Sequence, residues 1–260
     1  MTTSDGLRHN AAMTFLDSWT LGEHTGDSLD GRSLTFPTYR KGTGPGVIVI
    51  HEIPGLTAGV VGFAEEVVDA GFTVVLPHLF GIPGTRNNPL TVANSLRQVC
   101  VSKEFTKLAT RQTSPVAGWT RSLARDLHAE LGGPGVGALG MCFTGGFALA
   151  MMVDESVAAP VLCQPSTPFA IGRRRSADLD LSPADLETVK DRARGGCQVL
   201  GLQYDKDPTT GSRFATLTRE IGDAFIRVEF PGRKHATVTE HRQQEGVDRV
   251  LAFFSEKLAG

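Results

Sequence analysis

Short apolar segments alternate with helical patterns along most of this chain, and this alternation limits the folds that it can adopt. The predicted strands are Leu34–Phe36, Val47–Ile50, Phe72–Leu76, Val136–Leu139, Ala159–Cys163, Gln198–Leu202 and Phe225–Val228. Helical patterns at about 58–70, 92–108, 116–131, 143–154, 212–222 and 240–258 fall between most of them. Short, continuously apolar strands are typical of a parallel sheet with helices on both faces. We therefore predict an α/β fold with a mainly parallel central sheet covered on both faces.

The length of 260 residues suits one large domain over residues 1–260. Residues 1–40 are predicted to add structure at one edge of the sheet, and they contain no recognisable chemistry. Residues 165–196 contain three consecutive arginines, Arg173–Arg175, and a polar helix beginning near Ser182-Pro183, with Ser182 as its N-cap. This segment is either a lid or a solvated surface insertion, and its charged character favours the insertion.

Composition excludes several classes of function. The formal net charge of -2 argues against nucleic acid as the main partner. No apolar run approaches the roughly 18 residues that a membrane helix needs, and the first residues lack the apolar core of a secretory signal. Cysteines at 100, 142, 163 and 197 have neither metal-site spacing nor a Cys-x-x-Cys pair. These features predict a protein of the reducing cytoplasm that acts on a small molecule, and they leave its oligomeric state open.

Gly140–Gly146, with the sequence Gly-Met-Cys-Phe-Thr-Gly-Gly, lies between an apolar strand and the apolar segment Phe147–Val153. A turn of small residues that holds one nucleophile between a strand and a helix is the nucleophile elbow of the α/β-hydrolase fold. Such a turn lifts the side chain clear of the sheet, and the helix below it offers backbone N–H groups to a developing oxyanion. Here the nucleophile would be the thiol of Cys142.

The same stretch also fits two other interpretations. Most free cysteines are inert core residues, so the elbow pattern alone does not decide in favour of catalysis. Gly135, Gly137 and Gly140 also match the dinucleotide fingerprint, but these glycines precede Cys142 and lie within the predicted strand rather than after it. No acidic residue ends a matching second strand, so a nicotinamide site is rejected.

The remaining members of a catalytic triad follow the nucleophile in the order acid, then histidine, each after a strand. His235 follows the last predicted strand and precedes the final helix, which the other histidines do not. His241 is predicted to lie on that helix. Asp205 and Asp207 both follow the strand that ends near Leu202; Asp207-Pro resembles the usual turn of the acid, and Asp205 would then be a turn residue.

His51-Glu52-Ile53-Pro54-Gly55 follows the strand Val47–Ile50. The zinc-protease pattern requires a second histidine where this chain has Gly55, so no metal site is predicted. In a hydrolase, the loop after this strand supplies the second oxyanion donor. The backbone N–H groups of Ile53 and Phe143 are therefore the predicted oxyanion hole. Glu52 is either a plain polar loop residue or a carboxylate that points toward the nucleophile.

Together these residues resemble the dienelactone hydrolase family, α/β-hydrolases with a cysteine nucleophile. The resemblance extends over most of residues 45–258. Its landmarks are His51–Gly55, Ala70–Pro77, Gly140–Gly146, Asp207 and His235. It implies Cys142, Asp207 and His235 as the triad, Glu52 as the carboxylate that modulates the thiol, and backbone oxyanion donors from Ile53 and Phe143.

Three departures from the family concern the elbow and the substrate. The elbow usually has Gly where this chain has Thr144, which is tolerable if the backbone there avoids positive φ. Family members that act on a carboxylate-bearing lactone hold that carboxylate with two arginines, and this chain has Ile82 and Thr239 at those positions. Arg86, Arg233 and Lys234 are the residues on nearby loops that could substitute.

The sequence thus predicts an enzyme that cleaves an ester or lactone bond through a Cys-His-Asp triad and a thioester acyl-enzyme, with no metal or organic cofactor. One alternative is a thioesterase or carboxylesterase for a neutral acyl substrate, consistent with the apolar segment Leu79–Ile82. The other is a hydrolase fold retained as a non-catalytic binding protein. The order Cys142, Asp207, His235 argues against that role, since binding alone needs no triad.

Overall fold

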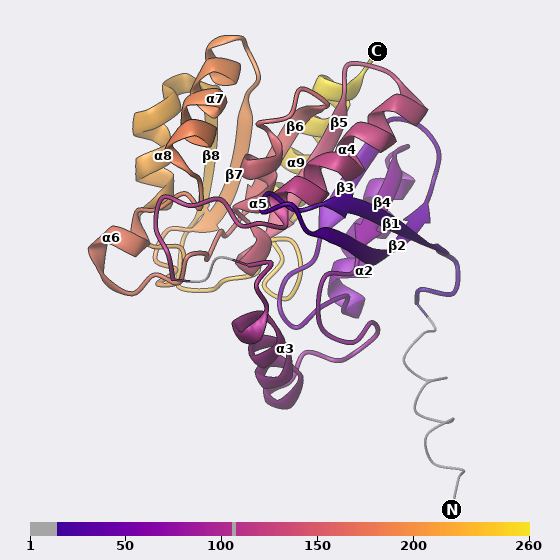
Figure 1. Ribbon diagram of the computed structural model, residues 1–260, viewed down its shortest axis with the longest axis horizontal. Coiled ribbons are helices and arrows are strands. Elements are labelled where there is room, and N and C mark those ends of the chain that lie inside the picture. Colours follow the sequence, from indigo (N-terminus) through magenta and orange to yellow (C-terminus); the bar gives the residue numbers. More distant parts are fainter. Residues whose placement is uncertain (1–14, 106–107) are drawn as a thin grey trace, which may run out of the picture.

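All seven predicted strands lie in one eight-stranded sheet in the computed structural model, which describes residues 15–105 and 108–260. The strand order is β1-β2-β4-β3-β5-β6-β7-β8. Strands β3 to β8 are mutually parallel. At one edge of the sheet, β2 runs antiparallel to β4, and β1 runs antiparallel to β2. The prediction of a mainly parallel α/β fold is therefore confirmed (Figure 1).

The bounds of the elements follow the predicted pattern closely in the centre of the sheet and less closely at its edge. The strands are β1 (Thr20–Asp27), β2 (Ser33–Lys41), β3 (Gly46–Ile50), β4 (Thr73–Pro77), β5 (Val136–Met141), β6 (Val157–Cys163), β7 (Val199–Tyr204) and β8 (Phe225–Phe230). The helices are α2 (Ala58–Asp69), α3 (Pro89–Val101), α4 (Ala117–Leu131), α5 (Phe147–Met151), α6 (Gly172–Ser176), α7 (Pro183–Arg194), α8 (Arg213–Ile221) and α9 (Gln244–Leu258). Short 3-10 turns, η1 (Cys142–Thr144) and η2 (Gly222–Ala224), complete the set.

The sheet separates two hydrophobic cores, because successive side chains of a strand point to opposite faces. On β3, Ile48 and Ile50 pack into the core under α4, α5, α7 and α8, whereas Val47 and Val49 pack into the core under α2 and α9. Every residue of β3, β4, β5 and β7 is buried. This double coverage explains why these strands are continuously apolar in the sequence.

Strand β1 is the strand of this sheet that the apolar patterns did not predict. Its residues Thr20–Asp27 are mostly polar and mostly exposed, and it pairs only with β2 at the edge of the sheet. It contacts α4 through a polar side chain and its backbone, since His24 Nε2 lies 2.8 Å from Ser122 Oγ and Trp119 Nε1 donates to the His24 carbonyl. A strand that packs through polar groups has no apolar pattern to reveal it.

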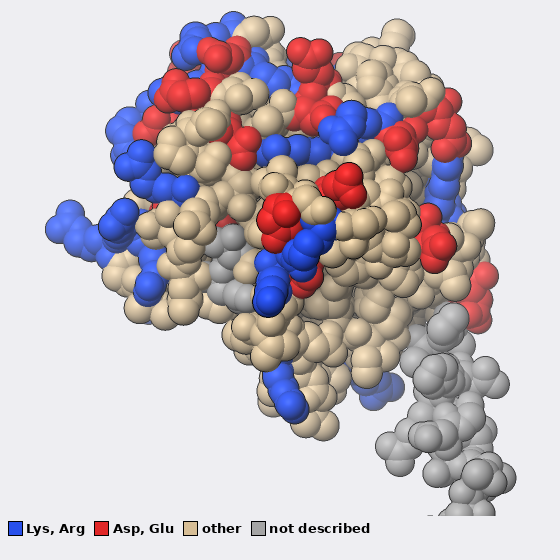
Figure 2. Space-filling model, viewed as in Figure 1, with Lys and Arg blue, Asp and Glu red and all other residues tan. Residues whose placement is uncertain are grey.

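Several helices differ from their predicted extents. Helix α3 begins earlier than predicted, at Pro89, with Asn88 as its N-cap in a capping box. Only Ser95 and Val99 of α3 are buried, and the helix projects from the body of the protein (Figure 1). The surface over α3 is mainly uncharged in Figure 2, whereas charged side chains gather over the opposite end of the molecule.

The segment 165–196 contains the short helix α6 and then α7, and Ser182 caps α7 by accepting a hydrogen bond from the Asp185 N–H, as predicted. Helix α9 begins only at Gln244. The prediction that His241 lies on this helix was therefore wrong, and His241 lies in the turn before it. Within residues 15–105 and 108–260, no helix has both the length and the apolar character needed to cross a bilayer.

Candidate active site

Cys142 lies at the carboxyl end of β5, in a sharp turn with φ of +53°. A positive φ is unfavourable for a residue with a side chain and is typical of the nucleophile elbow. The turn requires glycine at positions 140 and 145. A Cβ on Gly140 would lie 2.1 Å from the Thr144 carbonyl oxygen, and a Cβ on Gly145 would lie 2.5 Å from Pro165 Cα. The close approach of these backbones explains the small residues of the sequence motif.

Thr144, which stands where the family has glycine, is not among the residues with positive φ. The backbone at Thr144 therefore avoids positive φ, which is the condition for threonine to be tolerated there. Its buried hydroxyl accepts a hydrogen bond from the Met141 N–H (3.2 Å) and lies within hydrogen-bond distance of the Ile50 and His51 carbonyls (3.2 and 3.1 Å). The threonine therefore ties the elbow to the end of β3.

His235 lies on the loop after β8, and its Nδ1 is 2.5 Å from Asp207 Oδ2. The Asp207 side chain is 1% exposed, and its other oxygen accepts hydrogen bonds from the Thr209 N–H (2.9 Å) and hydroxyl (2.7 Å). Burial opposes the charge of Asp207, but the hydrogen bonds from His235 and Thr209 outweigh it and lower its pKa. The carboxylate is thus held ionised against the imidazole.

Asp205, the other candidate for the acid, does not contact His235. Its Oδ1 accepts a hydrogen bond of 2.7 Å from the Gly232 N–H, and its own N–H donates to the Phe230 carbonyl. It joins the loops after β7 and β8 as a turn residue. Of the two aspartates considered for the acid, Asp207 is therefore the one that contacts His235.

His235 interacts with Asp207 on one side and with the sulfur of Cys142 on the other. Burial alone would lower the pKa of His235, but the hydrogen bonds and charges of Asp207 and Cys142 raise it to about 10. A histidine with this pKa is an imidazolium at neutral pH. Its positive charge lies next to the sulfur of Cys142.

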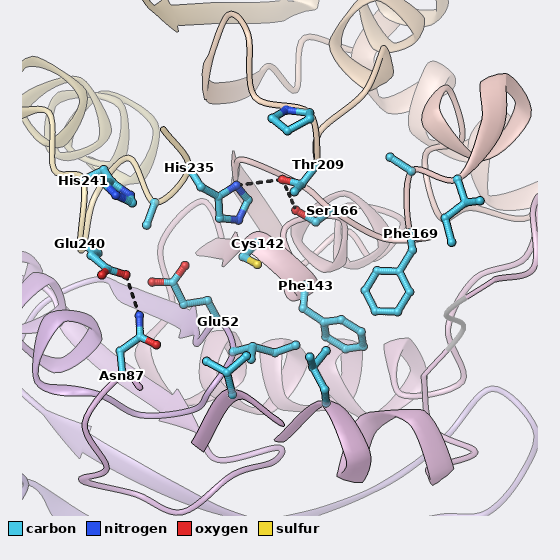
Figure 3. Close-up of a pocket in the computed structure, with 17 residues that line it drawn as sticks. Glu52, Asn87, Cys142, Phe143, Ser166, Phe169, Thr209, His235, Glu240 and His241 are labelled. Carbon is cyan, nitrogen blue, oxygen red and sulfur yellow. Dashed lines mark hydrogen bonds between the residues drawn. The ribbon is translucent and has the colours of Figure 1, made fainter. Parts of the chain in front are cut away.

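Glu52 follows β3, and Figure 3 shows its carboxylate pointing into the pocket beside Cys142. The residue is 8% exposed, and the Thr239 hydroxyl donates a hydrogen bond of 2.5 Å to its Oε1. Burial raises the pKa of Glu52, and the hydrogen bond from Thr239 opposes part of that rise. Thr239, at a position where the family has a carboxylate-binding arginine, therefore contacts Glu52.

His51 has a supporting role that the sequence did not reveal. It is fully buried, its Nε2 accepts a hydrogen bond from the Leu79 N–H (3.1 Å), and its Nδ1 is 3.1 Å from the Glu52 carbonyl oxygen. Burial lowers the pKa of His51 to about 3, so the ring is neutral and its Nδ1–H donates to that carbonyl. His51 thereby fixes the loop that contains Glu52 and Ile53.

Cys142 opens into a pocket of about 470 Å³ at the carboxyl edge of the sheet. Ile53 and Phe143, the predicted oxyanion donors, both line it. The other lining residues are Glu52, Asn87, Val92, Leu96, Ser166, Phe169, Ala170, Ile171, Pro208, Thr209, His235, Ala236, Glu240 and His241. Residues 166 and 169–171 belong to the segment 165–196, so part of that segment forms a wall of the pocket.

Lysine and arginine are absent from the described residues that line this pocket. Ile82 is 59% exposed and lies outside it. Arg86 lines a neighbouring hollow instead, and Arg233 and Lys234 are exposed elsewhere. None of the three candidate substitutes for the family arginines therefore lines the pocket. The described residues also contain no group of three or more His, Cys, Asp or Glu side chains that could hold a metal ion.

Comparison with known proteins supports the same conclusion about the fold. A model of the dienelactone hydrolase family matches residues 34–245. A putative dienelactone hydrolase from Klebsiella pneumoniae has 17% identity and a TM-score of 0.59, with 92% of this chain and 100% of that chain covered. The α/β-hydrolase GrgF from Penicillium sp. has 13% identity and a TM-score of 0.63, with coverages of 93% and 100%. No curated protein matches the chain.

A third similar structure is a dienelactone hydrolase-like promiscuous phosphotriesterase from metagenomic libraries. It has 15% identity and a TM-score of 0.57, and the alignment covers 92% of this chain and 99% of that chain. At these identities the structural matches establish a shared fold, whereas the family match covers most of the residues that form the site.

Proposed function

This chain belongs to the dienelactone hydrolase family of hydrolases, and from that premise we propose that it cleaves carboxylic ester or lactone bonds with Cys142 as nucleophile. His235 is the general acid and base, Asp207 orients it, and the backbone N–H groups of Ile53 and Phe143 stabilise the oxyanion. The observation that carries the proposal is the contact series from Asp207 through His235 to Cys142 at the floor of the pocket.

The resting state of the proposed enzyme is a thiolate–imidazolium pair. The Cys142 thiolate attacks the carbonyl carbon, and the carbonyl electrons move onto the oxyanion. When the tetrahedral intermediate collapses, the alcohol leaves with the proton from His235, and a thioester remains on Cys142. Neutral His235 then removes a proton from water, and the resulting hydroxide attacks the thioester. The second collapse releases the acid product and restores the thiolate beside protonated His235.

Glu52 acts on the charge state of Cys142 in this proposal. Its carboxylate lies beside Cys142 in the same pocket, and burial raises its pKa, so it is better able to accept a proton than an exposed glutamate. It accepts the thiol proton in the fraction of molecules in which His235 has not done so. The mechanism also needs Cys142 reduced, and we therefore propose a reducing compartment such as the cytoplasm.

The test compares wild type with Cys142→Ala on a short aryl ester, a neutral enol lactone, a carboxylated dienelactone and an acyl thioester. We expect turnover by wild type and loss of at least about 10³-fold in Cys142→Ala, because covalent catalysis is abolished. Cys100→Ala is the matched control, since Cys100 is exposed on α3 and does not line the pocket. Equal turnover by Cys142→Ala and wild type would exclude Cys142 as the nucleophile.

Alkylation separates an enzyme from a non-catalytic binding protein with the same fold. The imidazolium of His235 should keep Cys142 reactive toward iodoacetamide below the ordinary thiol pKa of about 8.5. Rapid modification of Cys142 in wild type, and slow modification in His235→Ala, are the expected results. Slow alkylation of every cysteine in wild type would favour the binding protein.

A further inference from the structure

Figure 3 shows Phe169 on one side of Cys142 and Glu52 with Glu240 on the other. The apolar lining of the pocket comprises Phe169 and Ile171 of the loop after β6 and Val92 and Leu96 of α3. The other side, next to Glu52, contains Glu240 from the loop after β8. A substrate bound at Cys142 therefore lies between an uncharged wall and an acidic one.

Glu240 is fixed in place by a neutral partner. Asn87 Nδ2 donates a hydrogen bond of 2.6 Å to Glu240 Oε2, and Figure 3 shows this pair at the rim of the pocket. An amide donor orients a carboxylate without cancelling its charge. Among the described residues, no lysine or arginine forms an ion pair with Glu240. The rim therefore presents a negative charge that is exposed to solvent, with Arg86 in the adjoining hollow that Glu240 also lines.

The charge of Glu240 acts inside the pocket as well as at its rim. It is one of the influences that raise the pKa of Glu52, behind the larger effect of burial. The positive charge of His235 is already paired with Asp207. A carboxylate on the substrate would have to lose its hydration against the apolar wall or approach Glu240 and Glu52, and both cost free energy.

We propose that Glu240, held by Asn87, is a specificity-determining residue that selects esters with uncharged, apolar acyl groups and rejects those with a carboxylate. The inference rests on the proposed function, because it concerns the substrate class of the same site. The acyl chain lies along Val92, Leu96, Phe169 and Ile171, and the acidic rim replaces the carboxylate-binding arginines of the family with a charge of the opposite sign.

The test uses two esters that differ mainly in one charge, 4-nitrophenyl hexanoate and mono-4-nitrophenyl adipate. We expect wild type to favour the hexanoate in kcat/KM by at least about tenfold at low salt, and higher salt should narrow the preference. Glu240→Lys should reduce the preference by about tenfold or more, mainly by increasing the rate on the adipate, and Glu240→Gln should have an intermediate effect. Glu23→Lys makes the same charge change on the exposed strand β1 and should leave the preference unaltered.

The outcomes separate this inference from the proposed function. If wild type hydrolyses both esters equally well, or if Glu240→Lys shifts the preference no more than Glu23→Lys does, Glu240 does not determine specificity and the Cys142 mechanism stands. If wild type hydrolyses neither ester, this inference fails; if it also turns over none of the four substrates used to test Cys142, the proposed function fails with it. A preference for the hexanoate that Glu240→Lys narrows and Glu23→Lys does not would support both.

Discussion

The elbow and the proposed triad are built differently from the pocket walls that surround them. A Cβ added to Gly140 or Gly145 of the elbow would lie only 2.1 to 2.5 Å from a backbone atom, and Asp207 is almost completely buried. Helix α3, which supplies Val92 and Leu96 to the pocket, has only Ser95 and Val99 buried. The difference suggests that the chemistry depends on a rigid part of the fold, whereas substrate choice depends on parts that tolerate change.

Asp207→Asn is the substitution with the largest expected effect on the rigid part. Without the carboxylate, His235 loses both its orientation and the partner that favours its charged form. We expect kcat/KM to fall about 10³-fold, or about 4 kcal/mol, with little change in KM. Asp205→Asn should change kcat/KM by less than about threefold, because Asp205 contacts Gly232 rather than His235. Equal losses in the two variants would contradict the assignment of Asp207 as the acid.

The pH dependence provides a second measurement on the same variant. The folded-state pKa of His235, about 10, lies above the ordinary value of 6.5. Protonated His235 therefore stabilises the folded state fully below pH 6.5, and this contribution is lost as the pH rises toward 10. We expect the unfolding free energy of wild type to fall over that range and that of Asp207→Asn to fall less. The basic limb of kcat/KM should also move from near 10 toward 6.5 in the variant.

Gly140→Ala tests the elbow itself. The new Cβ would lie 2.1 Å from the Thr144 carbonyl oxygen, which is backbone and cannot rotate away. We expect a loss of about 3 kcal/mol in unfolding free energy, measured by urea denaturation. Gly62→Ala in α2 is the control, because its Cβ would meet no atom within 4 Å and alanine favours a helix, so it should be neutral or stabilising by up to about 1 kcal/mol. A Gly140→Ala protein as stable as wild type would show that the elbow relaxes easily.

There is a physical reason why sequence patterns predicted the central strands and the small residues of the elbow. A buried parallel strand must be apolar, and a sharp turn with close backbones must use small residues, so both leave local marks such as Val47–Ile50 and Gly140–Gly146. The polar edge strand β1 left no such mark, because it contacts α4 through His24 and its backbone rather than through apolar side chains.

The pocket walls depend on contacts between segments far apart in the chain. Asn87 and Glu240 are hydrogen-bonded although they lie on the loops after β4 and β8. The apolar segment Leu79–Ile82 is consistent with a neutral substrate on sequence alone, yet Leu79 and Phe80 are buried in the core and Ile82 lies outside the pocket. Apolar character alone does not distinguish a core residue from one that contacts substrate.

Arg213 shows how a residue that looks like surface charge can support the rigid part. It is 2% exposed, and its guanidinium donates to the carbonyls of Thr167, Pro168, Arg175, Thr209 and Thr210. Burial lowers its pKa to about 10. These bonds join the turn after Asp207 to the loop before Phe169, so one buried cation positions both the acid and a pocket wall.

Arg213→Lys should therefore destabilise the protein by about 2 kcal/mol, since an ammonium group cannot satisfy five carbonyls in this planar arrangement. We also expect a lower kcat and a downward shift of the basic limb of the pH profile, because Thr209 would hold Asp207 less firmly. Arg219→Lys on the exposed end of α8 is the control, and it should change neither the stability nor the activity and its pH profile. Loss of stability without any shift of the pH profile would limit Arg213 to a structural role.

Leu96→Ala tests the pocket wall that α3 forms, and it should have the smallest effect on the stability of the protein. Leu96 lines the pocket from α3, a helix with few buried residues, so its loss should change the unfolding free energy by less than about 1 kcal/mol. The same substitution removes apolar contact with the acyl chain, and KM for 4-nitrophenyl hexanoate should rise about fivefold with kcat nearly unchanged. Leu90→Ala, on the same helix but 70% exposed and outside the pocket, should leave both constants as they are. If Leu96→Ala lowered stability as much as Gly140→Ala, α3 would belong to the rigid part of the molecule and the division between chemistry and substrate choice would not hold.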